Sequence, residues 1–198
     1  MPGRPLSPPR FLSALQAVAD GLSELGAPWM CIGGVAVIAL GVPRFTADVD
    51  ATVSAQRVDP EAILAALGRH DATPRVDRAV EFARRHQVVL LHHARSGVPI
   101  DISLAWLPFE TEAIQHARET DFAGVRIRVP RPDDLVVYKL VAARPRDVDD
   151  AEKLLAIHGR TLDLPRVRRL LEEFCRALED PSRLETFERL LRTTGLGT

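Results

Sequence analysis

The sequence has little of what marks several specialised protein classes. Aromatic residues make up only 5% of its 198 residues, so the core must be built from aliphatic side chains. Its two cysteines, Cys31 and Cys175, lie far apart in apolar or helical contexts, which favours buried thiols in a reducing compartment over a disulfide framework. No apolar run is long enough to span a bilayer, and the N-terminus has no apolar signal core. We therefore expect a cytoplasmic protein with no membrane partner.

Neither sign of charge dominates the chain. The formal net charge of −1 argues against coating of nucleic acid through bulk positive charge, although it leaves room for a local basic patch. Charged residues at 27% and apolar residues at 46% are typical of a folded globular chain. The length suits one domain, or one domain with a small appendage.

Apolar periodicity divides the chain near residue 130. Before that point strand-like runs alternate with helical ones, and after the linker at 129–133 the spacing is helical. We predict a core domain over residues 1–130 with an N-terminal helix that starts at Ser7, and a helical lobe over residues 131–198. The expected helices cover 11–25, 59–67, 77–85, 109–117, 135–143, 148–158, 164–178 and 184–191; the expected strands cover 29–32, 48–53, 88–92 and 98–105, with a hairpin within 121–130.

A diglycine opens the first candidate site. Gly33 and Gly34 separate the strand at 29–32 from a short apolar helix over 35–40. A glycine backbone can approach a ligand closely, and the N–H groups that open a helix attract anions. The diglycine is compatible with a phosphate cradle, although by itself such a pair is more often simply a tight strand–helix turn.

Two acids follow this helix at the start of the next strand. Asp48 and Asp50 are two positions apart, so their carboxylates should point into one small volume. Two like charges held that close are costly unless a cation lies between them, and the residues around them are apolar. A divalent metal is the expected counter-charge, although Asp-x-Asp also occurs at solvated strand ends and in metal-dependent glycosyltransferases.

A third acid interrupts the apolar strand predicted at 98–105. Ile100 and Ile102 share one face of this strand, and Asp101 projects from the other. A helix cap or a salt bridge would also explain a lone carboxylate. Its position in the middle of a strand favours a functional role.

Together these motifs resemble the nucleotidyltransferase superfamily, which includes DNA polymerase β, the antibiotic nucleotidyltransferases and the minimal nucleotidyltransferases. Its pattern is Gly-Gly or Gly-Ser, then Asp-x-Asp or Asp-x-Glu, then a third carboxylate flanked by apolar residues. The matching motifs here are Gly33-Gly34, Asp48-Val49-Asp50 and Ile100-Asp101-Ile102. The stretches IGGVAVIALGVPRFTADVD and KLVAARPRDVDDAEKLL are similar to the AbiEii-type branch, which contains toxins of toxin–antitoxin and abortive-infection systems.

The resemblance implies an α/β (α+β) fold: a nucleotidyltransferase mixed sheet flanked by helices, with a C-terminal helical lobe and the nucleotide between the two. It implies that Asp48, Asp50 and Asp101 hold two Mg²⁺ ions, with Mn²⁺ as a substitute. Asp101 would hold the ion nearest the acceptor hydroxyl, or act as the base.

The implied nucleotide-binding residues come from both parts of the chain: Gly33, Gly34, Arg44, Thr46, Lys139, Asp147 and Asp150. A solvated helix face is the alternative explanation for Lys139. Asp147 and Asp150 open a predicted helix, where acids also favour the helix dipole, so a purely structural role stays open for both.

The expected activity is Mg²⁺-dependent transfer of a nucleotidyl group from an NTP such as ATP to an acceptor. RNA, including tRNA, and a protein side chain are the acceptors that the resemblance suggests, and an antitoxin protein is the expected partner. Two alternatives stay open: a catalytically silent nucleotide-binding or partner-regulated module, and a small-molecule nucleotidyltransferase of the antibiotic-modifying type.

Overall fold

The computed structural model describes residues 8–197, so the predicted cap at Ser7 lies outside the described residues. Contacts between residues divide the chain into two compact units. We call residues up to 35 with 45–130 the sheet unit, and residues 36–44 with those from 131 onward the helical unit. These units are defined by contacts alone, and the predicted division into a core domain (1–130) and a helical lobe (131–198) stays a prediction.

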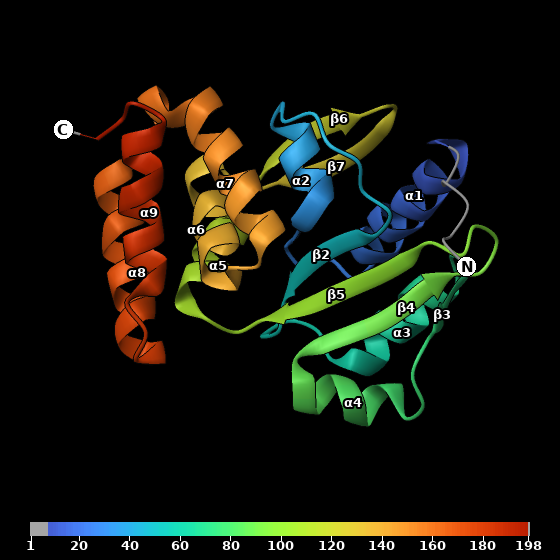
Figure 1. Ribbon diagram of the computed structural model, residues 1–198. Helices are drawn as coiled ribbons and strands as arrows, with labels where there is room; N and C mark the ends of the chain where they lie inside the picture. The colour runs from blue at the N-terminus through green and yellow to red at the C-terminus, as the bar shows by residue number, and fades with distance from the viewer. Residues whose placement is uncertain (1–7, 198) are drawn as a thin grey trace. The chain divides into compact units, whose positions relative to one another are not determined.

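The sheet unit is built on a five-stranded mixed sheet, shown from blue through teal to yellow-green in Figure 1. Its strand order is β1-β2-β5-β4-β3; β2 and β5 run parallel, and the other pairs are antiparallel. The strands are β1 (Trp29–Cys31), β2 (Val49–Ser54), β3 (Ala72–Pro74), β4 (Val88–His93) and β5 (Pro99–Ala105). The predicted mixed α/β sheet, including the β4–β5 hairpin, is confirmed.

Side-chain alternation in β5 follows the predicted pattern. Ile100 and Ile102 are buried, whereas Asp101 is partly exposed on the opposite face. Successive strand residues point to opposite sides of a sheet, so a shift of the strand register by one residue would expose the apolar set. The apolar residues thereby fix which face of the sheet carries the acids.

Helices and a hairpin complete the sheet unit. The helices are α1 (Pro8–Glu24), α3 (Pro60–Gly68), α4 (Ala79–His86) and α5 (Pro108–His116), and the hairpin is β6 (Arg118–Phe122) with β7 (Val125–Val129). The predicted start of α3 is confirmed, because the Asp59 carboxylate accepts a hydrogen bond from the Ala62 N–H over 2.8 Å. α1 packs on α3 and β7, and α4 packs on β4.

The helical unit contains the four C-terminal helices, drawn in yellow to red in Figure 1. They are α6 (Pro132–Ala142), α7 (Pro145–His158), α8 (Leu164–Leu178) and α9 (Ser182–Thr193), with a 3-10 turn at Gly159–Thr161. α6 packs against α7 and α8. Across residues 8–197, none of the helices has the length and apolarity that crossing a membrane requires.

The short helix α2 (Gly33–Ala39) begins earlier than predicted. Both glycines belong to its first turn, whereas the sequence placed them before the helix. Its residues from Ala36 onward group with the helical unit, where His158 Nε2 donates to the Leu40 carbonyl over 2.8 Å. The segment 36–44 is therefore held by the C-terminal helices, although it lies between two motifs of the sheet unit in the sequence.

Candidate active site

Strand register brings two of the predicted acids together in the sheet unit. Asp50 on β2 and Asp101 on β5 are direct partners in the parallel pair. Partners on neighbouring strands project from the same face, so both carboxylates lie on one side of the sheet. Neither residue is fully buried. The fold thus assembles an acid pair from motifs that are distant in the sequence.

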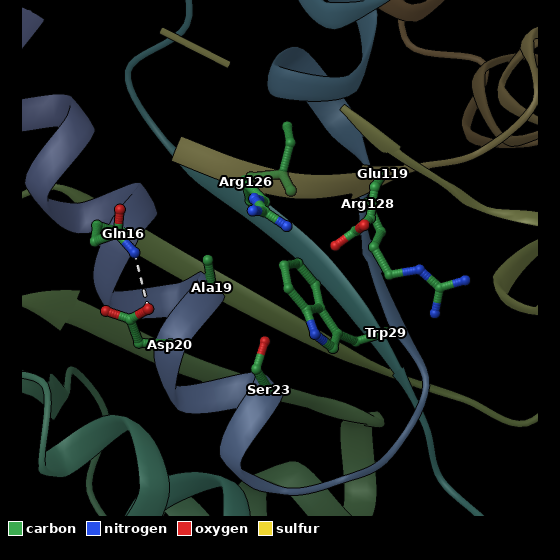
Figure 2. A pocket seen from close by; sticks show the side chains of 9 residues that line it. Gln16, Ala19, Asp20, Ser23, Trp29, Glu119, Arg126 and Arg128 are labelled. Carbon is green, nitrogen blue, oxygen red and sulfur yellow. Dashed lines mark hydrogen bonds between the residues drawn. The ribbon is translucent and has the colours of Figure 1, made fainter. Parts of the chain in front are cut away.

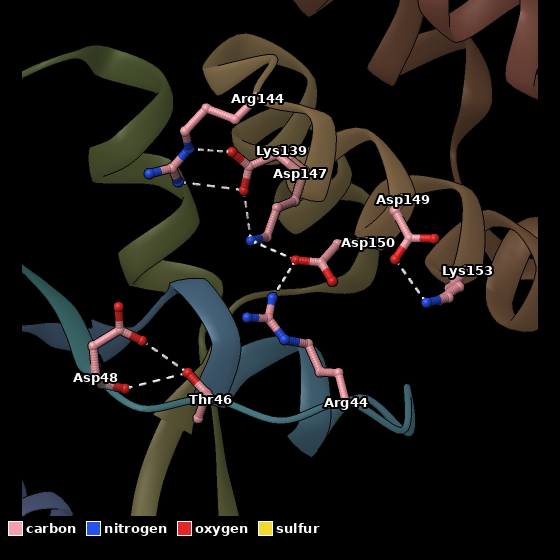
Figure 3. Close-up of polar contacts among 9 residues, drawn as sticks. All are labelled: Arg44, Thr46, Asp48, Lys139, Arg144, Asp147, Asp149, Asp150 and Lys153. Atoms are coloured by element: carbon pink, nitrogen blue, oxygen red, sulfur yellow. Dashed lines mark hydrogen bonds and ion pairs between the residues drawn. The ribbon is translucent and has the colours of Figure 1, made fainter. Parts of the chain in front are cut away.

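Asp48 lies immediately before β2 and not on the strand itself, which differs from the predicted strand start. Its side chain is nonetheless held, because Thr46 Oγ1 donates to Asp48 Oδ1 over 2.9 Å (Figure 3). Thr46 is buried, so this hydroxyl is fixed in place. The Thr46 hydroxyl therefore orients the Asp48 carboxylate.

The electrostatics of Asp101 depend on burial and on two charged neighbours. Burial raises the pKa of the Asp101 carboxyl most, Arg75 lowers it, and the charge of Asp48 raises it further; the net pKa is raised. Asp48 therefore acts on Asp101 across the site. The effect of the Asp48 charge on the pKa of Asp101 is expected for carboxylates that lie near one another.

Gly33 is required where α2 approaches Asp50. Its φ is +58°, and a Cβ added there would lie 2.7 Å from Cγ of Asp50. The Ile32 N–H also donates to the Asp50 carbonyl over 2.9 Å, which holds the two segments together. A side chain at Gly33 would displace Asp50, so the first glycine has a packing role beside the predicted phosphate role.

Arg75 was not anticipated from the sequence. Its Nη2 lies 2.5 Å from Oδ1 of Asp101, so the salt bridge that the sequence left open for this carboxylate is present. Arg75 follows β3, two strands away from β5, and its N–H donates to the Leu90 carbonyl on the intervening strand β4 over 3.1 Å. Nothing in the sequence indicates that strand order, and the arginine carried no motif that would have identified it.

The donor set of this face suits a hard divalent cation. Three carboxylates supply the oxygen ligands that Mg²⁺ prefers, from two neighbouring strand segments. Within residues 8–197, however, no three acidic, histidine or cysteine side chains are arranged closely enough to hold a metal ion. Thr46 and Arg75 instead hold Asp48 and Asp101. The residues fit a metal by chemistry, and binding would require their side chains to converge.

A second polar cluster lies in the helical unit and contains four other predicted residues, Arg44, Lys139, Asp147 and Asp150. Lys139 Nζ lies 2.9 Å from Asp147 Oδ1 and 2.9 Å from Asp150 Oδ2 (Figure 3). Arg44 also pairs with Asp150, and Arg144 Nε lies 2.5 Å from Asp147 Oδ2. The cluster therefore contains three cations and two carboxylates. We call these five residues the lysine cluster.

Burial distinguishes the lysine cluster from a surface network. Lys139 is 5% exposed, and Asp147 and Asp150 are 3% and 1% exposed. The alternative that placed Lys139 on a solvated helix face is therefore wrong. Burial by itself raises the pKa of the Asp147 carboxyl, but hydrogen bonds from Arg144 and Lys139 outweigh it and hold the pKa below its usual value.

Local sequence explains how this cluster forms. Ala143 adopts a left-handed conformation that ends α6, and Pro145 begins α7, so the last turn of α6 faces the first turn of α7. Asp147 and Asp150 are three positions apart on α7 and share a face. Asp149 points elsewhere and pairs with Lys153 over 2.7 Å.

A family model for the nucleotidyl transferase AbiEii toxin of type IV toxin–antitoxin systems matches residues 16–194. The chain belongs to the AbiEii family. The resemblance predicted from the diglycine and the three acids is thereby confirmed. No curated protein matches this AbiEii-family chain.

Solved structures agree with the fold of this AbiEii-family protein. The solution structure of the antibiotic-resistance factor ANT(2'')-Ia has a TM-score of 0.59 at 18% identity, covering 85% of this chain and 95% of that one. A crystal structure of ANT(2'')-Ia with adenylyl-2''-tobramycin has a TM-score of 0.58 at 18% identity, with 87% and 99% coverage. An antigenic nucleotidyltransferase-like protein from Paracoccidioides brasiliensis has a TM-score of 0.53 at 16% identity, with 92% and 95% coverage. These similarities establish a nucleotidyltransferase fold.

A separate ion-pair network in the helical unit was missed by sequence reasoning. Asp134 on α6 is fully buried and lies 2.7 Å from Arg166 Nη1 on α8 and 2.9 Å from Arg131 Nε. Acidic residues are common in the first turn of a helix because they interact favourably with the helix dipole. The pair Asp133–Asp134 therefore gave no sign in the sequence of a buried ion-pair network. The network joins α6 to α8 and has no evident chemical role.

A concavity of about 260 Å³ lies elsewhere on the sheet unit (Figure 2). It is formed by α1, β1 and the β6–β7 hairpin, and its lining residues are Gln16, Ala19, Asp20, Ser23, Trp29, Glu119, Arg126, Ile127 and Arg128. Trp29 is the strand partner of Val53, which lies near the C-terminal end of β2, whereas Asp50 lies near its N-terminal end. Its two acids and two arginines balance, so it favours no ligand class, and it contains none of the predicted site residues.

Proposed function

We propose that this AbiEii-family protein is a metal-dependent nucleotidyltransferase that moves a nucleotidyl group from an NTP to an acceptor hydroxyl or phosphate. The observation that carries the proposal is the register of Asp50 with Asp101 on parallel strands, with Asp48 immediately before β2 and near enough to raise the pKa of Asp101. A cluster of acids on a partly exposed face is costly without cations, so it has little value as a purely structural device.

The three acids would hold two Mg²⁺ ions, or Mn²⁺ in their place. When bound, such ions neutralise triphosphate oxygens and lower the pKa of an attacking hydroxyl. Asp48 and Asp50 would provide ligands to both ions. Asp101 would provide a ligand on the acceptor side, or accept the proton of the attacking hydroxyl, and Thr46 would keep Asp48 oriented.

The proposed nucleotide-binding residues differ in how the fold holds them. Gly33 leaves room for Asp50, and with Gly34 it would allow backbone approach to phosphate. Arg44 and Lys139 are the cations proposed for the triphosphate, and both are paired with Asp150. Asp147 and Asp150 would position these cations, so their contribution to nucleotide binding would be indirect.

The proposed acceptors are RNA, including tRNA, or a protein side chain, and the proposed partner is an antitoxin protein, in keeping with the family description. ATP is one candidate donor. The protein can be incubated with each labelled NTP, Mg²⁺ and total RNA, and compared with Asp48→Ala. Transfer by the wild type and its loss in the variant are expected; equal labelling by both proteins would contradict the proposal.

A matched control removes an exposed acid outside the candidate site. Asp149 is exposed and pairs with Lys153, so Asp149→Ala should label the acceptor as the wild type does. If Asp149→Ala and Asp48→Ala lost transfer equally, the loss would reflect general damage. Manganese in place of magnesium should support the same pattern.

A small-molecule acceptor is the second candidate. A structural neighbour has been crystallised with adenylyl-2''-tobramycin, a modified antibiotic, although that neighbour is only 18% identical. Parallel reactions with an aminoglycoside panel and with total RNA separate the two acceptor classes. Binding of NTP and Mg²⁺ by calorimetry, with no transfer to either class, would instead favour a catalytically silent module.

A further inference from the structure

Arg75 and Asp101 form an ion pair on the face that carries the acid pair. The atoms joined are Arg75 Nη2 and Asp101 Oδ1, at 2.5 Å, and about one third of each side chain is exposed. Asp101 has Asp50 as its partner on one side and Leu90 as its partner on the other. Arg75 is bonded to the Leu90 backbone, so a single row runs from Asp50 on β2 across β5 and β4 to Arg75, which lies just after β3.

Two charged neighbours act on the Asp101 carboxylate in opposite directions. Asp101 is attracted by Arg75 and repelled by Asp48. A divalent cation bound by the acids would take up Asp101 oxygens and would lie near the guanidinium, which carries the same sign of charge. Arg75 and a divalent cation cannot both interact with Asp101 at full strength.

Backbone hydrogen bonds keep Arg75 close to Asp101. The Arg75 N–H is held by the Leu90 carbonyl over 3.1 Å, and Leu90 is the strand partner of Asp101. The start of the arginine side chain is therefore anchored beside the acid. Its long stem still allows the guanidinium to move away, because the side chain is partly solvated.

We propose that Arg75 is a positioning residue that holds Asp101 and competes with the divalent cation for its carboxylate. Arg75 thereby sets the metal concentration at which the three acids converge on the cation. The inference rests on the proposed function in one respect, since it takes Asp48, Asp50 and Asp101 as the metal ligands. It adds a residue outside the two acidic motifs to the site.

Mn²⁺ binding in the absence of nucleotide tests this role directly. Free Mn²⁺ can be followed by electron paramagnetic resonance while Mn²⁺ is titrated into the protein of residues 1–198. Loss of one partly exposed ion pair should tighten Mn²⁺ binding by roughly two- to fivefold in Arg75→Gln. Arg75→Lys keeps the charge and should bind Mn²⁺ nearly as the wild type does, a rescue that a purely structural role would not predict.

Control variants isolate the pair. Arg95 is an exposed arginine of the same unit that pairs with Asp71, so Arg95→Gln should leave Mn²⁺ affinity unchanged. Asp101→Asn should weaken Mn²⁺ binding, and adding Arg75→Gln to it should produce no further change. If Arg75→Gln fails to fold by circular dichroism, Arg75→Met, which keeps the aliphatic stem, replaces it.

The outcomes separate this inference from the proposed function. Unchanged Mn²⁺ affinity in Arg75→Gln, or Mn²⁺ binding by the wild type that does not depend on Asp101, would overturn the inference even if nucleotidyl transfer is observed. Tighter binding in Arg75→Gln that disappears in the Asp101→Asn background would support it even if no NTP is transferred to any acceptor. In that case only the proposed function would fail.

Discussion

Asp50 and Asp101 are partners on the parallel strands β2 and β5, and this pairing is the centre of the candidate site. Their motifs are separated in the sequence by a helix, an edge strand, another helix and the strand β4. The parallel pairing requires that long crossover, because parallel strands cannot be joined by a tight turn. The chemistry of this AbiEii-family protein therefore depends on the sheet topology.

Replacing Asp50 tests the acid pair directly. Asp50→Asn keeps the size of the side chain and removes the charge that a divalent cation would bind. The rate of labelled nucleotidyl transfer should fall on the order of 100-fold or more, since even supporting groups of metal sites cost 10–100-fold. Asp149→Asn, which changes an exposed acid, provides the comparison, and an Asp50→Asn rate within twofold of it would argue against a metal role for Asp50.

Gly33→Ala should destabilise the protein more than a left-handed glycine ordinarily does. A Cβ at Gly33 would overlap the Asp50 side chain, whereas at Gly26, with a similar φ of +62°, it would meet no described atom within 4 Å. Gly26→Ala should lower the free energy of unfolding by about 1 kcal/mol, and Gly33→Ala by at least ~2 kcal/mol. Urea denaturation of both variants measures the difference, and equal losses would show that the Asp50 contact is unimportant.

Lys139→Met should cost stability because it leaves buried carboxylates without their ammonium partner. Removing one member of a buried ion pair typically costs several kcal/mol, and we expect a loss of about 3 kcal/mol. Lys153→Met removes an exposed helix pair with Asp149 and should cost no more than about 0.5 kcal/mol. Unfolding in urea provides the measurement. A raised KM for NTP with unchanged stability would mean that Lys139 acts on phosphate alone.

Acid should reveal the contribution of Asp147. Its folded-state pKa is lowered, so its stabilising effect is fully present above the unfolded pKa, near pH 4, and is lost as the pH falls through the folded value. Asp147→Asn should therefore be less stable than the wild type at pH 7, and the difference should shrink as the pH falls below 4. Urea denaturation from pH 7 to pH 3 measures this. A difference independent of pH would contradict the assignment.

Thr46→Val should lower activity without a large change in folding. The variant keeps the shape of the side chain and removes the hydroxyl that donates to Asp48. We expect a 10- to 100-fold fall in transfer rate, the range typical of residues that orient metal ligands. Thr73→Val, which loses a hydroxyl contact with His92 on the same sheet, is a matched control and should transfer normally. Equal rates for the two variants would remove Thr46 from the site.

Apolar residues that recur at every second position, or at every third to fourth position, predicted most of the strands and helices. The helix α8 spans 164–178 as predicted, and β5 buries Ile100 and Ile102 as its alternation requires. The predicted start of α2 was wrong. Glycines usually break helices, but here Gly33 and Gly34 form the first turn of the helix. Most of these errors shift boundaries, but the edge strand β3 (Ala72–Pro74) was not predicted at all, because three residues are too few to show a strand period.

The sequence by itself determined the acids and their spacing, the apolar faces of the strands and the helical character of the C-terminal region. These features depend on residues close together in the chain, where backbone geometry sets which side chains share a face. Only the tertiary structure decided that Arg75 reaches Asp101, that Gly33 makes room for Asp50, and that Lys139 is buried between two acids. Such contacts follow from strand order, register and helix packing, which join residues that local periodicity cannot relate.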